Sequence, residues 1–218
     1  MDTNQILGMV AEYLGHTRPA LRCQVTDDHG DEVSATIRCE HVAGPPGDQD
    51  TVQELRALKA NSAALLADLY ERHDGLTLFR IVDDPEAFGF RLPSLVEAAA
   101  LTEDMCSGSL SEHARQLGLP YPHGEYRVIA IGSDEDTRFC WFTAGKHNGV
   151  ALTDKVYYFS LDPTEDMETP LADSAAKFLT SVLEQPMEFL ENIFFDIEIP
   201  GGDGETVLPP FEYVADWP

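Results

Sequence analysis

Three apolar segments between residues 126 and 161 constrain the fold of this 218-residue chain more than any other part of its sequence. They read YRVIAIG (126–132), TRFCWFT (137–143) and VYYFSL (156–161), and they are rich in the β-branched and aromatic residues that favour strands. A short acidic turn separates the first two, and Asn148-Gly149, which tolerates the backbone of a tight hairpin turn, precedes the third. The pattern predicts three strands of one buried sheet, so the rest of the chain must supply the elements that cover it.

The first fifty residues predict a helix followed by a hairpin. Ile6, Leu7 and Val10 fall at helical spacing, and Pro19 ends the pattern. Alternating apolar residues on both sides of a polar, Gly-containing turn then predict a β-hairpin that buries Cys23 and Cys39.

Helices and strands alternate after residue 50. Thr51 with Glu54, and Ser94 with Glu97, form capping-box patterns that start two helices. Strand patterns lie between them at 76–82 and 87–92, and apolar positions between 173 and 183 mark a last helix face. We expect nine residues of these elements to be buried together: Leu65, Leu69, Phe90, Ile129, Ile131, Phe139, Trp141, Tyr158 and Phe178.

The expected fold class is therefore α+β, a mixed, curved β-sheet with helices packed around it, plus an N-terminal helix and β-hairpin. Composition divides the chain into an N-terminal extension (1–50), a central α+β domain (51–199) and a Gly/Pro-rich tail (200–218) whose aromatic residues pack back on the domain. The stretch AGPPGDQD (43–50) is a linker by composition. It permits the hairpin either to extend the sheet or to act as a dimer arm.

The net charge narrows the choice of partners. Asp and Glu number 39 against 14 Lys and Arg, which gives −25 at pH 7. A protein that binds a phosphate backbone needs clustered cations, so we expect no direct nucleic-acid binding and no binding to an anionic membrane. A basic protein is the favoured partner, since long-range attraction steers it to an acidic surface. Residues 161–218 carry 14 of the acids and one base, so they are the most electronegative part.

The sequence favours a cytoplasmic location. The N-terminus MDTNQILGMV has neither the basic start nor the apolar stretch of a signal peptide, and no segment approaches the length of a membrane span. Four scattered cysteines without CxxC spacing are typical of reduced thiols.

No motif for catalysis, a cofactor or a metal is present. The HExxH, Walker, GxGxxG and GxSxG patterns are all missing. Cys23, His29, Cys39 and His41 fit no common zinc spacing, and Cys140 lies inside a strand rather than at an activating helix end. We expect no catalytic residue, no cofactor and no bound metal, and a protein that is not an enzyme.

The order of several short motifs resembles one protein family. LYERHDG (69–75) ends a helix, LPSLVE (92–97) follows a strand pair, and VIAIGSD, FCWF, FSLD and AKFL follow in turn. Over residues 52–190 the chain resembles the SUKH superfamily, to which the yeast cell-wall-assembly regulator belongs and whose bacterial members are mostly immunity proteins. The resemblance implies an α+β domain that binds and neutralises a toxin, often a nuclease or a deaminase.

Resemblance and charge together predict a partner-binding surface for a basic toxin domain. We expect it in two acidic loops that follow central strands: Asp134, Glu135, Asp136, Asp162, Glu165, Asp166 and Glu168. Two alternatives remain open, a regulatory or scaffold protein on the same fold and a metal-dependent hydrolase. The identity of the partner and the oligomeric state also stay open.

Overall fold

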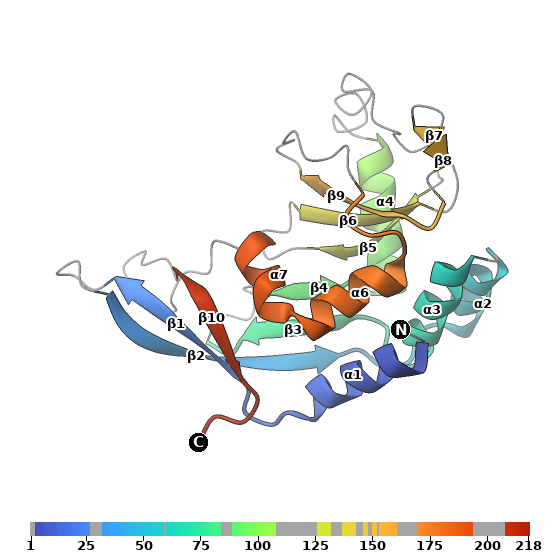
Figure 1. Cartoon of the computed structure of the whole chain (residues 1–218). Helices are drawn as coiled ribbons and strands as arrows, with labels where there is room; N and C mark the ends of the chain where they lie inside the picture. Colours follow the sequence, from blue (N-terminus) through green and yellow to red (C-terminus); the bar gives the residue numbers. More distant parts are fainter. Residues whose placement is uncertain are drawn as a thin grey trace.

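The main element of the fold is an eight-stranded sheet with the order β10-β1-β2-β3-β4-β5-β6-β9 (Figure 1). The computed structural model describes residues 3–26, 32–58, 60–83, 89–107, 126–131, 137–142, 146–147, 150–151, 153–160, 170–193 and 208–218. The strands of the sheet are β1 (Ala20–Thr26), β2 (Glu32–Ala43), β3 (Leu76–Ile81), β4 (Phe90–Leu92), β5 (Tyr126–Ile131), β6 (Thr137–Phe142), β9 (Val156–Ser160) and β10 (Leu208–Val214). A separate short pair is formed by β7 (Lys146–His147) and β8 (Val150–Ala151).

The helices lie mainly along the inner strands of this sheet. They are α1 (Thr3–Gly15), α2 (Gln49–Ala57), α3 (Asn61–Tyr70), α4 (Leu95–Ser107), α6 (Ala175–Glu184) and α7 (Pro186–Ile193). Helices α1, α3 and α6 contact one another, α1 also contacts β2, and α4 packs against β5. In Figure 1, α6 and α7 cross in front of the central strands while α2 and α3 form a pair at one side. The α+β class expected from the sequence is confirmed.

The sheet is antiparallel at each of its seven strand pairings, not mixed as expected. The reason is clearest at the helical connection between β2 and β3. Ala43, the last residue of β2, is the register partner of Leu76, the first residue of β3. Helices α2 and α3 therefore return the chain to the end of the sheet that it left, and a parallel pair would require a crossover to the other end.

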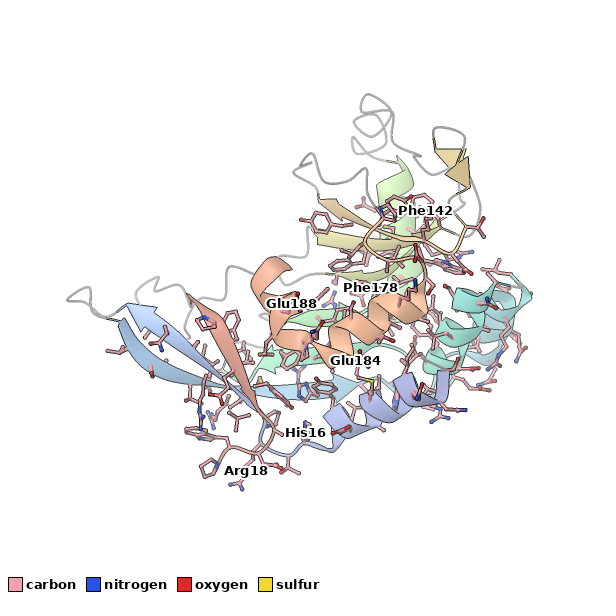
Figure 2. The ribbon with its side chains drawn as sticks, viewed as in Figure 1. His16, Arg18, Phe142, Phe178, Glu184 and Glu188 are labelled. Atoms are coloured by element: carbon pink, nitrogen blue, oxygen red, sulfur yellow. The ribbon has the colours of Figure 1, made fainter. Side chains whose placement is uncertain are left out.

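Eight of the nine predicted core residues are buried, and Tyr158 is half-buried against the core. At the centre, the rings of Phe90 and Phe139 on the sheet meet Phe178 of α6 and Phe189 of α7, with centroids 5.0–6.2 Å apart. Figure 2 shows Phe178 on the sheet side of α6. These contacts fix α6 and α7 on the central strands, because aromatic rings bury a large apolar area in a defined geometry.

Both terminal segments belong to this same sheet and core. The hairpin β1–β2 extends the sheet, because β2 pairs with β3, and Ile6, Leu7 and Val10 of α1 are part of the buried cluster. Strand β10 pairs with the outer edge of β1. The tail aromatics pack back as predicted, since Phe211 is buried and Tyr213 lies against the core.

The segment with linker composition is bound tightly to the end of α3. Gly44 N–H donates to the carbonyl of Gly75 (2.9 Å), and Gly47 N–H donates to the carbonyl of Tyr70 (2.8 Å). A Cβ at Gly44 would collide with the carbonyl of Asp74. The glycines here permit close approach of two backbones.

Candidate functional site

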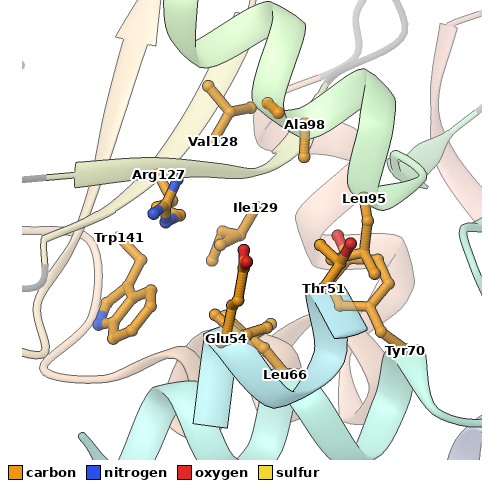
Figure 3. Close-up of a pocket in the computed structure, with 12 residues that line it drawn as sticks. Thr51, Glu54, Leu66, Tyr70, Leu95, Ala98, Arg127, Val128, Ile129 and Trp141 are labelled. Atoms are coloured by element: carbon orange, nitrogen blue, oxygen red, sulfur yellow. The ribbon is translucent and has the colours of Figure 1, made fainter. Parts of the chain in front are cut away.

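A cavity of about 190 Å³ opens between α2 and α4, over strands β5 and β6 (Figure 3). It draws residues from five elements: Thr51, Glu54, Leu55, Leu66, Tyr70, Leu95, Ala98, Ala99, Arg127, Val128, Ile129 and Trp141. Nine of the twelve are apolar or aromatic, so the interior accepts an apolar group.

Small residues on α4 leave the space that the cavity occupies. Ala98 and Ala99 line the cavity together with the larger side chains of Leu55, Leu66 and Trp141. Those three side chains are buried. Part of the cavity wall therefore belongs to the buried core of the molecule.

Trp141 is held in place by Asp154, in the turn before β9. The indole Nε1–H of Trp141 donates to Asp154 Oδ1 (3.2 Å), and the backbone N–H of Ser62 donates to the same oxygen (3.4 Å). Asp154 lies in the left-handed region with φ 64°, and Trp141 has 0% exposure. Ser62 Oγ in turn accepts the N–H of Ala175 at the start of α6 (3.1 Å). The Asp154 carboxylate thus links the cavity wall to α3, and the hydroxyl of Ser62 links α3 to α6.

On the opposite side, Thr102 and Tyr70 attach α4 to its neighbours. The hydroxyl of Thr102 donates to the carbonyl of Ala98 (2.6 Å) and accepts the N–H of Val128 (3.1 Å). Tyr70 Oη donates to the carbonyl of Pro93, just before α4 (2.9 Å). Burial, and then the nearby Asp74, raise the pKa of Tyr70, so its phenol stays a donor at neutral pH.

The rim of the cavity is polar and carries two opposite charges. Glu54 on α2 and Arg127 on β5 line the cavity and are exposed to solvent, which places them at its mouth, and Figure 3 shows Glu54 extending from α2 toward β5. Within the described residues, neither side chain forms an ion pair. Six other described cations do pair with carboxylates of the chain: Arg22, Arg38, Arg56, Arg80, Arg91 and Lys177. The rim therefore presents a carboxylate and a guanidinium that are open to an external group.

Exposed apolar side chains continue the surface around the mouth. Leu58, 40% exposed, follows Glu54 and Leu55 by one helical turn and so lies on the same side of α2. Val96, 79% exposed, lies next to Ala99 around the circumference of α4. The two helices that flank the cavity thus both present apolar groups to solvent.

A second cluster of ionisable groups joins the end of α1 to β2, β3 and β10. Phe79 N–H donates to His41 Nδ1 (3.2 Å), so the hydrogen of a neutral His41 lies on Nε2. That nitrogen donates to the hydroxyl of Tyr213 (2.9 Å), whose own hydrogen is then directed to His16 Nδ1 (2.6 Å). Figure 2 shows His16 where α1 ends beside β10.

This chain of hydrogen bonds requires a neutral His41. Burial, and then His16, lower the pKa of His41 to about 4. Its ring also supports an irregular stretch of β3, because the β2–β3 register shifts between Glu40 and Val42 and Phe79 has φ 58°. A positive φ is costly for a bulky residue, and the hydrogen bond from Phe79 helps to stabilise that conformation. The cluster joins α1 to the sheet, and its hydrogen bonds depend on the protonation state of His41.

The seven predicted partner-binding acids, Asp134, Glu135, Asp136, Asp162, Glu165, Asp166 and Glu168, lie outside the described residues. The two loops adjoin described residues that lie close together. Thr137, which follows the first loop, and Ser160, which precedes the second, are register partners in β6 and β9.

The cysteines behave as strand residues where the structure describes them. Cys23, Cys39 and Cys140 are buried and free of disulfides, which confirms the burial predicted for the two hairpin cysteines. Burial, and then Glu40, raise the pKa of Cys39 to about 12. His29 lies outside the described residues, and within those residues no three metal-ligating side chains come together.

The cavity is not evident from the sequence, because its residues also fit patterns with other roles. The capping box predicted for Thr51 and Glu54 is wrong. The N-cap is Asp48, whose carboxylate accepts the Thr51 N–H (3.0 Å) and so takes the role expected of Thr51. Helix α2 therefore begins at Gln49, and Glu54 lies in its second turn, facing the cavity. The alanine run 98–100 was the available signal, since small residues on a core-facing helix leave space.

Comparison with models of known protein families finds no match, and comparison with curated proteins finds no significant one. Within the described ranges, no helix combines the length and the apolar character needed to cross a bilayer.

Proposed function

We propose that this protein is an acidic protein-binding domain that acts as an immunity protein, binding and neutralising a basic toxin directed at nucleic acid. In this proposal the chain is a SUKH-type inhibitor of the cytoplasm, works by stoichiometric binding, and needs no catalytic residue or cofactor. The motif order over residues 52–190 supports the family assignment.

The observation that carries the proposal is the distribution of charge. The chain has a net charge of −25, and six of the cations that the structure describes are paired with carboxylates of the chain. Acids exceed cations by 25, so the field around the protein is negative. A toxin that cleaves or deaminates nucleic acid presents a basic groove, and an acidic surface is steered to that groove.

The two acidic loops after β5 and β9 are the proposed contact. Each follows a strand of the central sheet, and their attachment points Thr137 and Ser160 are partners in one ladder. Charged side chains in such loops raise the association rate more than they slow dissociation.

The test measures binding and inhibition of the basic toxin domain encoded beside this gene. We expect inhibition of its nuclease or deaminase activity at a 1:1 ratio, with an association rate that falls as salt rises and the Debye length shrinks to about 8 Å at 0.15 M. The double variant Asp134→Lys, Asp136→Lys should lower the association rate at least about tenfold.

A matched control makes the same change in net charge elsewhere. Glu12→Lys with Glu184→Lys alters two exposed acids on α1 and α6, and we expect its effect to be much smaller. Equal effects of the two double variants would place recognition outside the loops. Binding of a basic partner without inhibition would favour the regulatory alternative, and absence of binding would refute the proposed function.

A further inference from the structure

We infer that the cavity between α2 and α4 receives one aromatic side chain of a basic partner protein, and that a Lys or Arg beside this aromatic residue pairs with Glu54. The inference rests on the proposed function for the basic character of the partner. The binding of an aromatic side chain is inferred from the cavity alone.

The size of the cavity fits a single ring. Its volume is about 190 Å³, whereas sites for cofactors and larger metabolites usually measure about 300–1,000 Å³. An apolar cavity of about 150 Å³ is large enough to bind benzene. A Phe, Tyr or Trp side chain therefore matches the space, and a nucleotide does not.

The walls match the chemistry of an aromatic anchor. Leu55, Leu66 and Ile129 supply apolar contacts, and the buried indole of Trp141 supports the wall beside them. Asp154 fixes the Trp141 indole through Nε1, so little rotamer entropy is lost when the wall receives a ligand. Preformed pockets that take one buried aromatic residue are typical of binding hot spots.

The charged residues at the rim favour particular partner residues beside the aromatic anchor. Glu54 is an exposed carboxylate without an ion-pair partner among the described residues, and it lies at the mouth (Figure 3). A Lys or Arg adjacent to the anchor reaches it, and the field of a chain at −25 favours that cation over an anion. Arg127 lies at the mouth beside Trp141, where a guanidinium can cover the face of an entering ring.

The exposed apolar groups beside the mouth favour a protein partner over a free small molecule. Leu58 caps the C-terminus of α2 and Val96 lies on α4, the two helices that flank the opening. A polypeptide whose aromatic residue enters the cavity would cover both, whereas a ligand contained in the cavity would leave them in water.

The first experiment uses short peptide probes and needs no toxin. In a Trp217→Phe background, Trp141 is the only tryptophan, so its fluorescence reports occupancy of the cavity. We expect saturable binding of acetyl-Phe-Lys-amide, about fivefold weaker binding of acetyl-Phe-Glu-amide, and no saturation with acetyl-Ala-Lys-amide. Glu54→Gln should remove the preference for Lys and retain binding of both Phe peptides.

The second experiment fills the cavity in the full chain. Ala98→Phe should abolish the saturable fluorescence change and weaken binding of the toxin domain about 30-fold or more. Ala11→Phe places the same side chain on the exposed side of α1, which contributes no residue to the cavity, and should change neither. Circular dichroism checks folding, and if Ala98→Phe does not fold, Ala99→Leu fills part of the same space.

The two experiments separate this inference from the proposed function. Toxin binding that is unaffected by a folded cavity-filling variant, or the lack of any saturable response to the Phe peptides, would overturn the inference and leave the immunity role standing. A saturable Lys-selective response to the Phe peptides, lost on filling the cavity, supports the inference even where the toxin domain does not bind.

Discussion

At the scale of single residues, His41 makes the stability of the protein depend on pH. An imidazole has a pKa of about 6.5 in the unfolded chain, and burial lowers that of His41 to about 4 in the fold. Between these values the unfolded chain binds more protons, so stability is complete above pH 6.5 and falls as the pH drops toward 4. The loss attributable to His41 is at most about 3 kcal/mol.

The measurement is urea unfolding of the wild type and His41→Gln at pH 7.0 and 4.5. The carboxylates titrate in both proteins, so the difference between the two free energies of unfolding isolates the imidazole. We expect the variant to be the less stable protein at pH 7 and to lose less stability on acidification. Parallel losses in the two proteins would contradict the role of His41.

Asp154 gives a second prediction at this scale. Asp154→Ala removes the acceptor of two hydrogen bonds, from Trp141 and from Ser62, and puts alanine at φ 64°. We expect a loss of about 2–3 kcal/mol in the free energy of unfolding. Asp154→Asn keeps an acceptor oxygen and tolerates the left-handed region, so it should lose less than half as much. Thermal and urea unfolding compare the two, and equal losses would show that the hydrogen bonds contribute little.

At the scale of elements, two glycines should respond in opposite directions to the same substitution. Gly44→Ala places a methyl group against the carbonyl of Asp74 and should cost about 2 kcal/mol or more. Gly8 lies within α1 with no atom near its potential Cβ, so Gly8→Ala should stabilise the protein by about 0.5–1 kcal/mol. Differential scanning calorimetry of both variants checks the sign of each change in stability. A Gly44→Ala variant with unchanged stability would show that residues 44–48 are free to shift from the end of α3.

Elements were easier to predict than the site because they depend on local patterns. The continuous apolar run at 128–131 reflects a strand that is buried on both faces, and the helical period of apolar residues in 175–183 reflects burial of one helix face. Both patterns appear in a short window of sequence. The cavity depends on where Glu54, Ala98 and Arg127 meet, and these residues come from two helices and a strand. The bond between His16 and Tyr213 spans 197 positions. Such contacts follow from the tertiary fold, which no local pattern contains.

At the scale of the whole molecule, salt should act in opposite directions on folding and on binding. A chain at −25 repels itself in the compact state, and raising the salt from 0.01 to 0.1 M shortens the Debye length from about 30 to about 10 Å. We expect a higher melting temperature and slower association with a basic partner over the same range. Scanning fluorimetry and stopped-flow binding measure the two. A melting temperature that falls with salt would show that the internal ion pairs outweigh the repulsion.

Strand β10 has a consequence for the way the protein is made in the cell. The ribosome releases β1 before any other strand of the sheet and β10 after all of them, yet the two are neighbours. While the intervening chain is being translated, the outer edge of β1 has unpaired N–H and C=O groups, which can pair with another nascent chain. A folding chaperone that covers this edge until residues 208–214 emerge would therefore raise the yield of correctly folded protein.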